Sequence, residues 1–179
     1  MSRLSEKYNK EIIAEFQKTG FENKLAVPKV TKVVVSSGIG KFRENDKIKE
    51  MVKSNLAAIT GQMPAVRKAK KAISGFKVRE GEEVGYIVTL RGEKMYDFLD
   101  KLANTVLPQV RDFRGLDPKS FDRAGNFNLG IREHIVFSEI AAHADNIHSL
   151  EVTIVTSASK NEDGQKLLEM LGFPFKKEK

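Results

Sequence analysis

The sequence contains no cysteine and no long apolar run, and each absence excludes a class of protein. Without cysteine the chain forms no disulfides, thiolate zinc sites or iron–sulfur clusters, and it has no cysteine nucleophile. No apolar stretch approaches the ~18 residues of a membrane span. The first residues mix acids and bases with short apolar positions, unlike a signal peptide. We therefore expect a soluble, cytoplasmic protein with no membrane partner.

The patterns typical of enzymes and metal sites are missing as well. No Gly-x-Ser-x-Gly sequence marks a nucleophile elbow. Three histidines, His134, His143 and His148, are separated by nine and five residues, which matches neither a helical i,i+4 metal pair nor the usual zinc spacings. We interpret them as surface or loop histidines. The sequence predicts no catalytic residue, no metal site and no cofactor.

Two glycines, Gly38 and Gly40, follow a hydrophobic stretch, as in a nucleotide-binding fingerprint. The third glycine position of the dinucleotide pattern is Arg43, whose bulky side chain stands where helix and strand should pack closely. A Walker phosphate loop fails too, because Lys41 is followed by Phe42 and the upstream glycine is missing at the required spacing. We interpret the segment as a turn that ends a strand. A nucleotide-dependent enzyme is the weaker alternative.

The charge of the chain favours a polyanionic partner. It carries 31 Lys and Arg against 24 Asp and Glu, a formal net charge of +7, and its pI is about 9.5. Clustered cations gain affinity by displacing the counterions condensed on phosphates. Residues 1–92 hold 19 Lys and Arg against 10 Asp and Glu, whereas residues 93–179 hold 12 against 14. We expect RNA phosphates to contact the first half.

One short run concentrates this positive charge. Four cations occupy five positions, with no acid among them: Arg67, Lys68, Lys70 and Lys71. A solvated strand face is the alternative interpretation of such a run. The charge asymmetry of the chain favours contact with phosphates instead.

Apolar periodicity predicts an α+β fold. Helices are expected from Ser2 to about Gly20, from Asn45 or Asp46 to Gly61, over Met95–Val106, and just before Gly172. Strands are expected over 32–37, 86–91 and 150–154, and residues 64–85 predict one or two strands and a mobile loop. The connections are too varied for a doubly wound parallel sheet. We expect a mixed, largely antiparallel sheet with helices packed on one face and long functional loops.

Strand alternation predicts which side chains lie on the uncovered face of that sheet. Successive side chains of a strand point to opposite faces, so Val33 and Val35 oppose their neighbours, as do Val88 and Leu90. If these apolar rows face the helices, the other face is basic and hydroxyl-bearing. Its members are then Lys32, Ser36, Thr89 and Arg91.

The segment 108–131 keeps no period for long and is crowded with Arg, Asp and Gly. Long irregular segments in compact domains are usually functional or disordered. Its phenylalanines Phe113, Phe121 and Phe127 predict an ordered, anchored loop. The mixture of Arg111 and Arg114 with aspartates suits a junction with protein or RNA.

Five short strings point to a known family: Ile-Thr-Gly-Gln at 59–62, Gly-Phe-Lys-Val-Arg-Glu-Gly at 75–81, Val-Thr-Leu-Arg-Gly at 88–92, Arg-Asp-Phe-Arg-Gly at 111–115 and Phe-Pro-Phe at 173–175. Each string is weak alone. In this order and at these spacings, they closely resemble the bacterial-type large-subunit ribosomal protein five family over essentially the whole chain.

The resemblance implies a single α+β domain over 1–179. It would be a structural constituent of the large subunit that binds 5S rRNA and attaches it to 23S rRNA in the central protuberance. About 1–92 would form a basic half that binds 5S rRNA, and about 93–179 a charge-balanced half with the irregular segment 108–131. In the family, polar residues that correspond to Ser36, Gln62 and Thr89 contact 5S rRNA. With the basic positions above, the expected 5S rRNA contacts are Lys32, Ser36, Gln62, Arg67, Lys68, Lys70, Lys71, Thr89 and Arg91.

Position 36 departs from the family, which usually has Asn there. A hydroxyl has a shorter reach than an amide and one donor where the amide has two. The direct contact at Ser36 is therefore expected to be lost or bridged by water.

Two further contacts follow from the resemblance. The glycine-flanked loop 74–85 resembles the family's protruding loop that approaches P-site tRNA, with Ser74, Gly75, Phe76, Lys77, Val78 and Arg79 as its contacting residues. Part of 108–148 resembles the region that meets a small-subunit head protein in an intersubunit bridge, with Arg111 and Arg114 at that bridge or at an rRNA junction. Neighbouring large-subunit proteins would be further partners. A regulatory RNA-binding module outside the ribosome is the main alternative.

Overall fold

The structure is a computed structural model that describes residues 2–42, 44–140 and 147–176. The chain forms two compact units, each discontinuous in sequence. Unit 1 comprises residues 1–33, 90–129 and 153–179, and unit 2 comprises residues 34–89 and 130–152. Each unit is described by itself.

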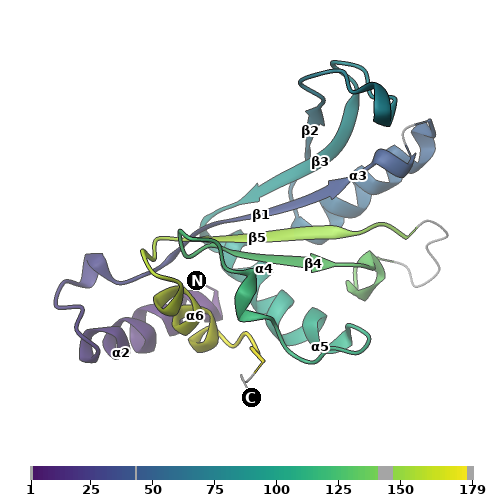
Figure 1. Ribbon diagram of the computed structural model, residues 1–179. Helices are drawn as coiled ribbons and strands as arrows, with labels where there is room; N and C mark the ends of the chain where they lie inside the picture. Colours follow the sequence, from purple (N-terminus) through teal and green to yellow (C-terminus); the bar gives the residue numbers. More distant parts are fainter. Residues whose placement is uncertain (1, 43, 141–146, 177–179) are drawn as a thin grey trace. The chain divides into compact units, whose positions relative to one another are not determined.

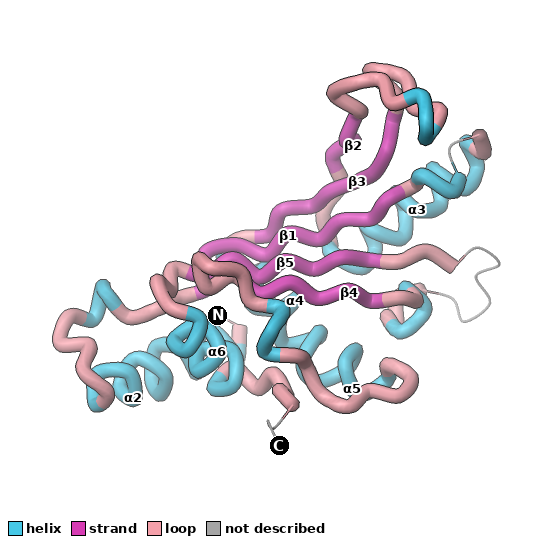
Figure 2. Tube along the Cα trace, in the orientation of Figure 1, coloured by secondary structure: helices cyan, strands magenta, loops and turns pink. Residues whose placement is uncertain are grey.

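The strands form one five-stranded antiparallel sheet in the order β2-β3-β1-β5-β4. They are β1 (Val30–Gly38), β2 (Ala65–Lys68), β3 (Glu83–Leu90), β4 (Phe127–Ile131) and β5 (Leu150–Thr156). Figures 1 and 2 show the strands side by side, with β2 and β3 forming a hairpin. The expected α+β class with a largely antiparallel sheet is confirmed.

The N-terminal helix of unit 1 runs through α1 (Arg3–Lys7), the turn Tyr8–Ile12 and α2 (Ile13–Lys18). Ser2 is its N-cap, because its Oγ accepts a hydrogen bond from the Ser5 N–H at 3.4 Å. The middle turn is wide, and the Ile13 N–H donates to the Tyr8 carbonyl five residues back. The apolar residues that recur every four positions are buried: Leu4, Tyr8, Ile12 and Phe16.

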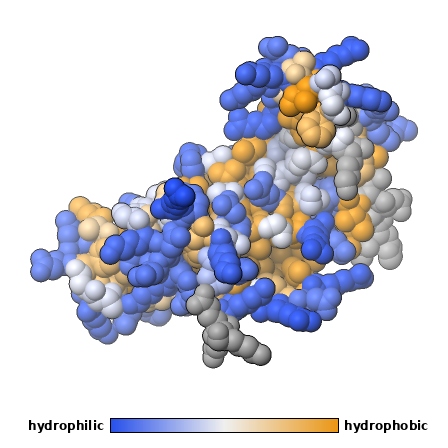
Figure 3. Space-filling model, viewed as in Figure 1, coloured by the Kyte–Doolittle hydropathy of each residue, from blue (hydrophilic) through white to orange (hydrophobic). Residues whose placement is uncertain are grey.

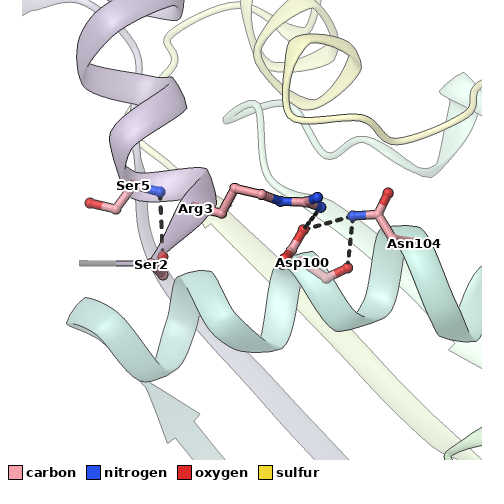
Figure 4. A network of polar contacts seen from close by, with 5 residues as sticks. All are labelled: Ser2, Arg3, Ser5, Asp100 and Asn104. Atoms are coloured by element: carbon pink, nitrogen blue, oxygen red, sulfur yellow. Dashed lines mark hydrogen bonds and ion pairs between the residues drawn. The ribbon is translucent and has the colours of Figure 1, made fainter.

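Unit 1 also contains α4 (Gly92–Lys101), the turn Leu102–Val106, α5 (Leu107–Gln109) and α6 (Asn161–Met170). Helices α1 and α4 are joined by a polar network (Figure 4). Arg3 forms an ion pair with Asp100 at 2.7 Å, and Asn104 donates to the same carboxylate oxygen at 2.7 Å. The core of this unit includes Leu99, Leu102 and Leu167, all fully buried.

Unit 2 contains one long helix, α3 (Asp46–Thr60). The Asn45 side chain accepts a hydrogen bond from the Ile48 N–H, which caps the helix at the expected position. Gly61 ends it with φ +63°, a left-handed conformation that favours glycine. Lys49 and Glu50 lie close enough to Tyr86 to affect its pKa, so α3 covers the face of β3 that carries Tyr86 and Val88.

Two of the three phenylalanines in the segment 108–131 anchor it through ring contacts. The Phe121 and Phe127 rings lie 4.9 Å apart, and Phe175 lies 5.4 Å from Phe127. The Asp122 carboxylate accepts hydrogen bonds from the Asn126 side-chain amide and from the Asn126 and Ala124 N–H groups, at 2.8, 2.8 and 2.9 Å. These bonds lower the pKa of the Asp122 carboxyl, the Asn126 side chain most. The segment also contains β4, which sequence periodicity did not predict.

Within the described parts of the chain, no helix combines the length and the apolar character needed to cross a membrane.

Candidate nucleic-acid interface

The sheet of unit 2 has one covered and one open face. In β1, Val35 and Ser37 are buried, whereas Val34 and Ser36 are partly exposed. In β3, Tyr86 and Val88 are buried, whereas Ile87 and Thr89 are partly exposed. We call the side with Ser36, Ile87 and Thr89 the open face. The expected alternation of both strands is present.

Gln62 and Thr89 are brought together at the end of α3. The left-handed turn at Gly61 directs the chain away from the helix, and the exposed Gln62 side chain reaches β3. Its Nε2 donates a hydrogen bond to the Thr89 carbonyl at 3.3 Å. One donor of the Gln62 amide, its carbonyl oxygen and the Thr89 hydroxyl retain capacity for a ligand. Gln62 and Thr89, which are 27 positions apart in sequence, therefore lie side by side and present their polar atoms together.

Ser36 has a partner that the sequence did not predict. Its Oγ donates to the Glu151 Oε2 at 3.3 Å, and Glu151 is an exposed residue of β5. The alternation of Leu150, Val152 and Ile154 in the sequence was sufficient to place Glu151 on the opposite face from them.

The basic run lies along the edge of the sheet. Arg67 and Lys68 belong to β2, an edge strand whose residues are all exposed, and Lys70 and Lys71 follow it, also exposed. Arg67 pairs with Gly85 and Ala65 with Ile87, so both side chains lie on the side of the open face. Lys68 pairs with Glu83 across the hairpin, so an acid that is distant in sequence stands beside the run.

The loop that follows is a hydrogen-bonded extension of the β2–β3 hairpin. Its mobility stays a prediction. Ile73 and Val78 exchange two backbone hydrogen bonds, at 2.9 and 3.2 Å. Between them, Ser74–Phe76 form a 3₁₀ turn and Lys77 has φ +51°. Phe76 is 71% exposed and Ile73 49% exposed. Figure 3 shows hydrophilic side chains around a small hydrophobic group at this hairpin.

The remaining candidate residues belong to unit 1. Lys32 is a partly exposed residue of β1, and Arg91 is an exposed residue at the N-cap of α4. Arg111 and Arg114 are exposed in the loop after α5. Asp112 between them has φ +54°, which fixes a sharp turn. The structure does not bring these four residues together with Ser36, Gln62 and Thr89 in one unit.

Of the interpretation as surface or loop histidines, the surface part is wrong for His134 and His148, which lie in a short turn and in a loop but are not exposed. Both are buried in unit 2, with stacked rings whose centroids lie 3.9 Å apart. The reason is that β1 and α3 supply partners: the His148 Nδ1 lies 3.1 Å from the Ser37 Oγ, and its Nε2 lies 3.4 Å from the Asn55 Nδ2. His143 lies outside the described residues. Among the residues that are described, no cluster of three metal-ligating side chains occurs.

The glycines at 38 and 40 form a turn. The Ile39 N–H donates to the Val84 carbonyl at 3.0 Å, so the chain still pairs with β3 at this point. Gly40–Phe42 then form a 3₁₀ turn, and α3 begins only at Asp46. A phosphate-binding loop leads directly into its helix, so this geometry favours the turn interpretation. Arg43 lies outside the described residues.

Comparison with known proteins identifies the family. The model of the ribosomal protein L5 family matches residues 23–79, and the model of the C-terminus of the same ribosomal family matches residues 83–175. The chain belongs to the ribosomal protein L5 family. The large ribosomal subunit protein uL5 of Halothermothrix orenii is 51% identical over 177 residues, which cover 98% of this chain and 99% of that protein. The uL5 proteins of Carboxydothermus hydrogenoformans and Caldanaerobacter subterraneus are each 48% identical, over 98% and 99% of this chain and 99% and 100% of those proteins.

Membership of the L5 family establishes the general role. The protein is a structural constituent of the large ribosomal subunit in the cytoplasm and is not an enzyme. The two family models meet between β2 and β3, and unit 2 takes residues from both.

Proposed function

We propose that the protein binds 5S rRNA through the open face of unit 2 and attaches it to 23S rRNA in the central protuberance. The observation that carries the proposal is the contact between Gln62 and Thr89, which joins two of the three polar positions implied by the family resemblance. Ser36, the third, is partly exposed on the same face as Thr89. The three positions therefore form a polar surface within one compact unit.

Charge and shape have separate roles in this proposal. Residues 65–79 carry six Lys and Arg and no Asp or Glu, and this segment supplies affinity by neutralising phosphates. Such contacts are independent of nucleotide sequence. The neutral donors and acceptors of Gln62 and Thr89 contact base edges or 2′-hydroxyls, which selects the shape of one RNA. Ser36 contributes a single hydroxyl.

The hairpin loop is proposed to contact P-site tRNA through residues 74–79. Lys77 and Arg79 are the phosphate contacts, and Phe76 is exposed beside them. The backbone pairing of Ile73 with Val78 supports this loop, because it joins the segment that enters the loop tip to the segment that leaves it. A preorganised loop loses less conformational entropy on binding than a mobile one.

The loop after α5 is proposed to contact neighbouring proteins or rRNA, including a small-subunit head protein across an intersubunit bridge. Arg111 and Arg114 are exposed there, and aspartates at 112 and 117 offset their charge. A charge-balanced surface suits a protein partner better than a phosphate backbone does.

The experiment that tests the proposal is a 5S rRNA binding assay at several salt concentrations. The logarithm of the affinity should fall linearly with the logarithm of the salt concentration, by ~0.7 to 0.9 per neutralised phosphate. Gln62→Ala and Thr89→Ala should each weaken binding about tenfold, because a hydrogen bond is lost at a desolvated interface.

Matched controls are Gln17→Ala and Thr105→Ala, which remove the same side chains from exposed positions of unit 1. Absence of affinity refutes 5S rRNA binding, and affinity that is independent of salt refutes phosphate neutralisation by residues 65–79. Equal losses for the controls and the open-face variants show that the face is wrongly assigned. Failure of the protein to copurify with large subunits would favour a regulatory RNA-binding module.

A further inference from the structure

An acid lies on the open face, next to a position proposed to contact RNA. Glu151 is an exposed residue of β5, and its Oε2 accepts a hydrogen bond from the Ser36 Oγ at 3.3 Å. Its neighbours Leu150 and Val152 are buried, so Glu151 points to the same side as Ser36 and Thr89. Both partners of this hydrogen bond belong to unit 2.

A carboxylate at this place restricts which part of an RNA lies against it. Like charges within a Debye length, about 8 Å at physiological salt, repel one another, so a phosphate in contact with Glu151 is disfavoured. An ionised carboxylate only accepts hydrogen bonds, and its two oxygens offer about four acceptor sites. The Ser36 hydroxyl occupies one of them. The others require donors: the amino or imino N–H groups of bases, or a 2′-hydroxyl.

We infer that Glu151, positioned by Ser36, is a specificity-determining residue that accepts a hydrogen bond from a nucleotide N–H or O–H of 5S rRNA. The inference rests on the proposed function. In this inference the short side chain of Ser36 fixes the rotamer of Glu151 through their hydrogen bond. The longer Glu151 side chain then places its carboxylate against the RNA. Ser36 is in this sense a positioning residue.

The sign of the effect of Glu151→Gln on 5S rRNA affinity tests the inference. The substitution raises the net charge of the chain by one, so attraction to phosphates alone predicts equal or tighter binding. A lost charge-assisted hydrogen bond predicts weaker binding instead. We expect Glu151→Gln to weaken binding several-fold and Glu151→Ala at least tenfold, because the amide retains one acceptor oxygen and alanine retains none.

Glu50→Gln is the matched control. Glu50 is an exposed residue of α3 in the same unit, and the substitution changes the net charge equally. It should leave affinity unchanged or slightly improved. The unfolding midpoint of each variant, measured beside the wild type, shows whether the loss arises from misfolding. Ser36→Ala should weaken binding less than Glu151→Ala, and the two effects should not add, since both act through one carboxylate.

A carboxylate also binds Mg²⁺, which would bridge it to a phosphate. Replacing Mg²⁺ by hexamminecobalt, which has no exchangeable coordination position, separates the two cases. The loss caused by Glu151→Gln should persist in hexamminecobalt. If Glu151→Gln no longer weakens binding in hexamminecobalt, the inference is overturned and a metal bridge is favoured.

Analogue interference identifies the donor. Inosine removes the guanine amino group and 2′-deoxynucleotides remove the hydroxyl. Interference by one of them at a position in the wild-type complex that vanishes with Glu151→Ala identifies that group as the donor. If the wild type binds 5S rRNA while both Glu151 variants bind as tightly or more tightly, this inference alone fails. If the wild type does not bind 5S rRNA, the proposed function itself fails.

Discussion

At the scale of single residues, the buried histidines of unit 2 have tautomers that their partners determine. The Ser37 hydroxyl donates its one proton to the Ser149 carbonyl at 2.9 Å, so the His148 Nδ1–H donates to the Ser37 Oγ. The Nε2 of neutral His148 is then an acceptor for the Asn55 amide. The His134 Nδ1 accepts from the His148 backbone N–H at 3.3 Å, which places the His134 proton on Nε2. That buried Nε2 has no hydrogen-bond partner among the described residues.

This arrangement predicts a loss of stability at acidic pH. Burial and the neighbouring His134 lower the pKa of His148 from 6.5 to about 4, and burial lowers the pKa of His134. Between pH 6.5 and about 4 the unfolded chain therefore binds more protons than the folded chain. The free energy of unfolding should fall as pH is lowered through this window, by about 3 kcal/mol from His148.

The measurement is an NMR titration of the imidazole signals, together with urea unfolding at pH 7 and pH 4.5. His148 should titrate near pH 4 in the folded protein. A His148 signal that titrates near pH 6.5 in the folded protein would show that this residue is not held neutral by its surroundings.

At the scale of secondary-structure elements, β1 and β3 approach closely at Gly85. A Cβ at this position would lie 2.8 Å from the Ser37 carbonyl oxygen, closer than carbon–oxygen contacts allow. We expect Gly85→Ala to lower the free energy of unfolding by about 1–3 kcal/mol, because the strands must shift apart. Urea unfolding of the two proteins measures the difference.

Gly130→Ala is the control for this prediction. Gly130 is also a strand residue, in β4, but a Cβ there meets nothing within 4 Å. Its substitution should change the free energy of unfolding by no more than about 0.5 kcal/mol. If the two substitutions have equal effects, the close approach of β1 and β3 does not limit position 85.

Sequence periodicity predicted the elements whose hydrophobic pattern is regular. The stripe along α3, its Asn45 cap and its end at Gly61 are all present, as are β1, β3 and β5. It missed β4, although Phe127, Leu129 and Ile131 alternate with two other residues, because this strand is short and follows a long irregular segment. It also did not predict the pairing of Ile73 with Val78, since this pairing depends on hydrogen bonds between backbone groups that side-chain patterns do not show.

At the scale of the whole molecule, charge predicts an RNA partner but does not locate the interface. Unit 2 holds 12 Lys and Arg against 10 Asp and Glu, because it takes residues 130–152 with four acids and one arginine. Its net charge is therefore small, although residues 65–79 are strongly basic. A division of the chain near residue 92 could not anticipate units that are discontinuous in sequence.

The candidate site was predictable to different degrees. Alternation placed Ser36 and Thr89 on one face without reference to any relative, while Gln62 came only from the family resemblance. The Gln62–Thr89 contact depends on a left-handed turn at Gly61 and on long-range packing. The Ser36–Glu151 contact and the burial of the two histidines could not be predicted for a common reason: the partners lie between 14 and 115 positions apart in sequence.

The most direct test of the central claim uses the absence of cysteine, because a single introduced thiol reports on its own position. Ala65→Cys places a thiol on the exposed edge of the open face, and Ala58→Cys places one on exposed α3 in the same unit. With saturating 5S rRNA, the alkylation rate at position 65 should fall at least about fivefold while the rate at position 58 stays unchanged, since bound RNA excludes reagent only where it covers the surface. An unchanged rate at position 65, or equal protection at both positions, would contradict binding through the open face.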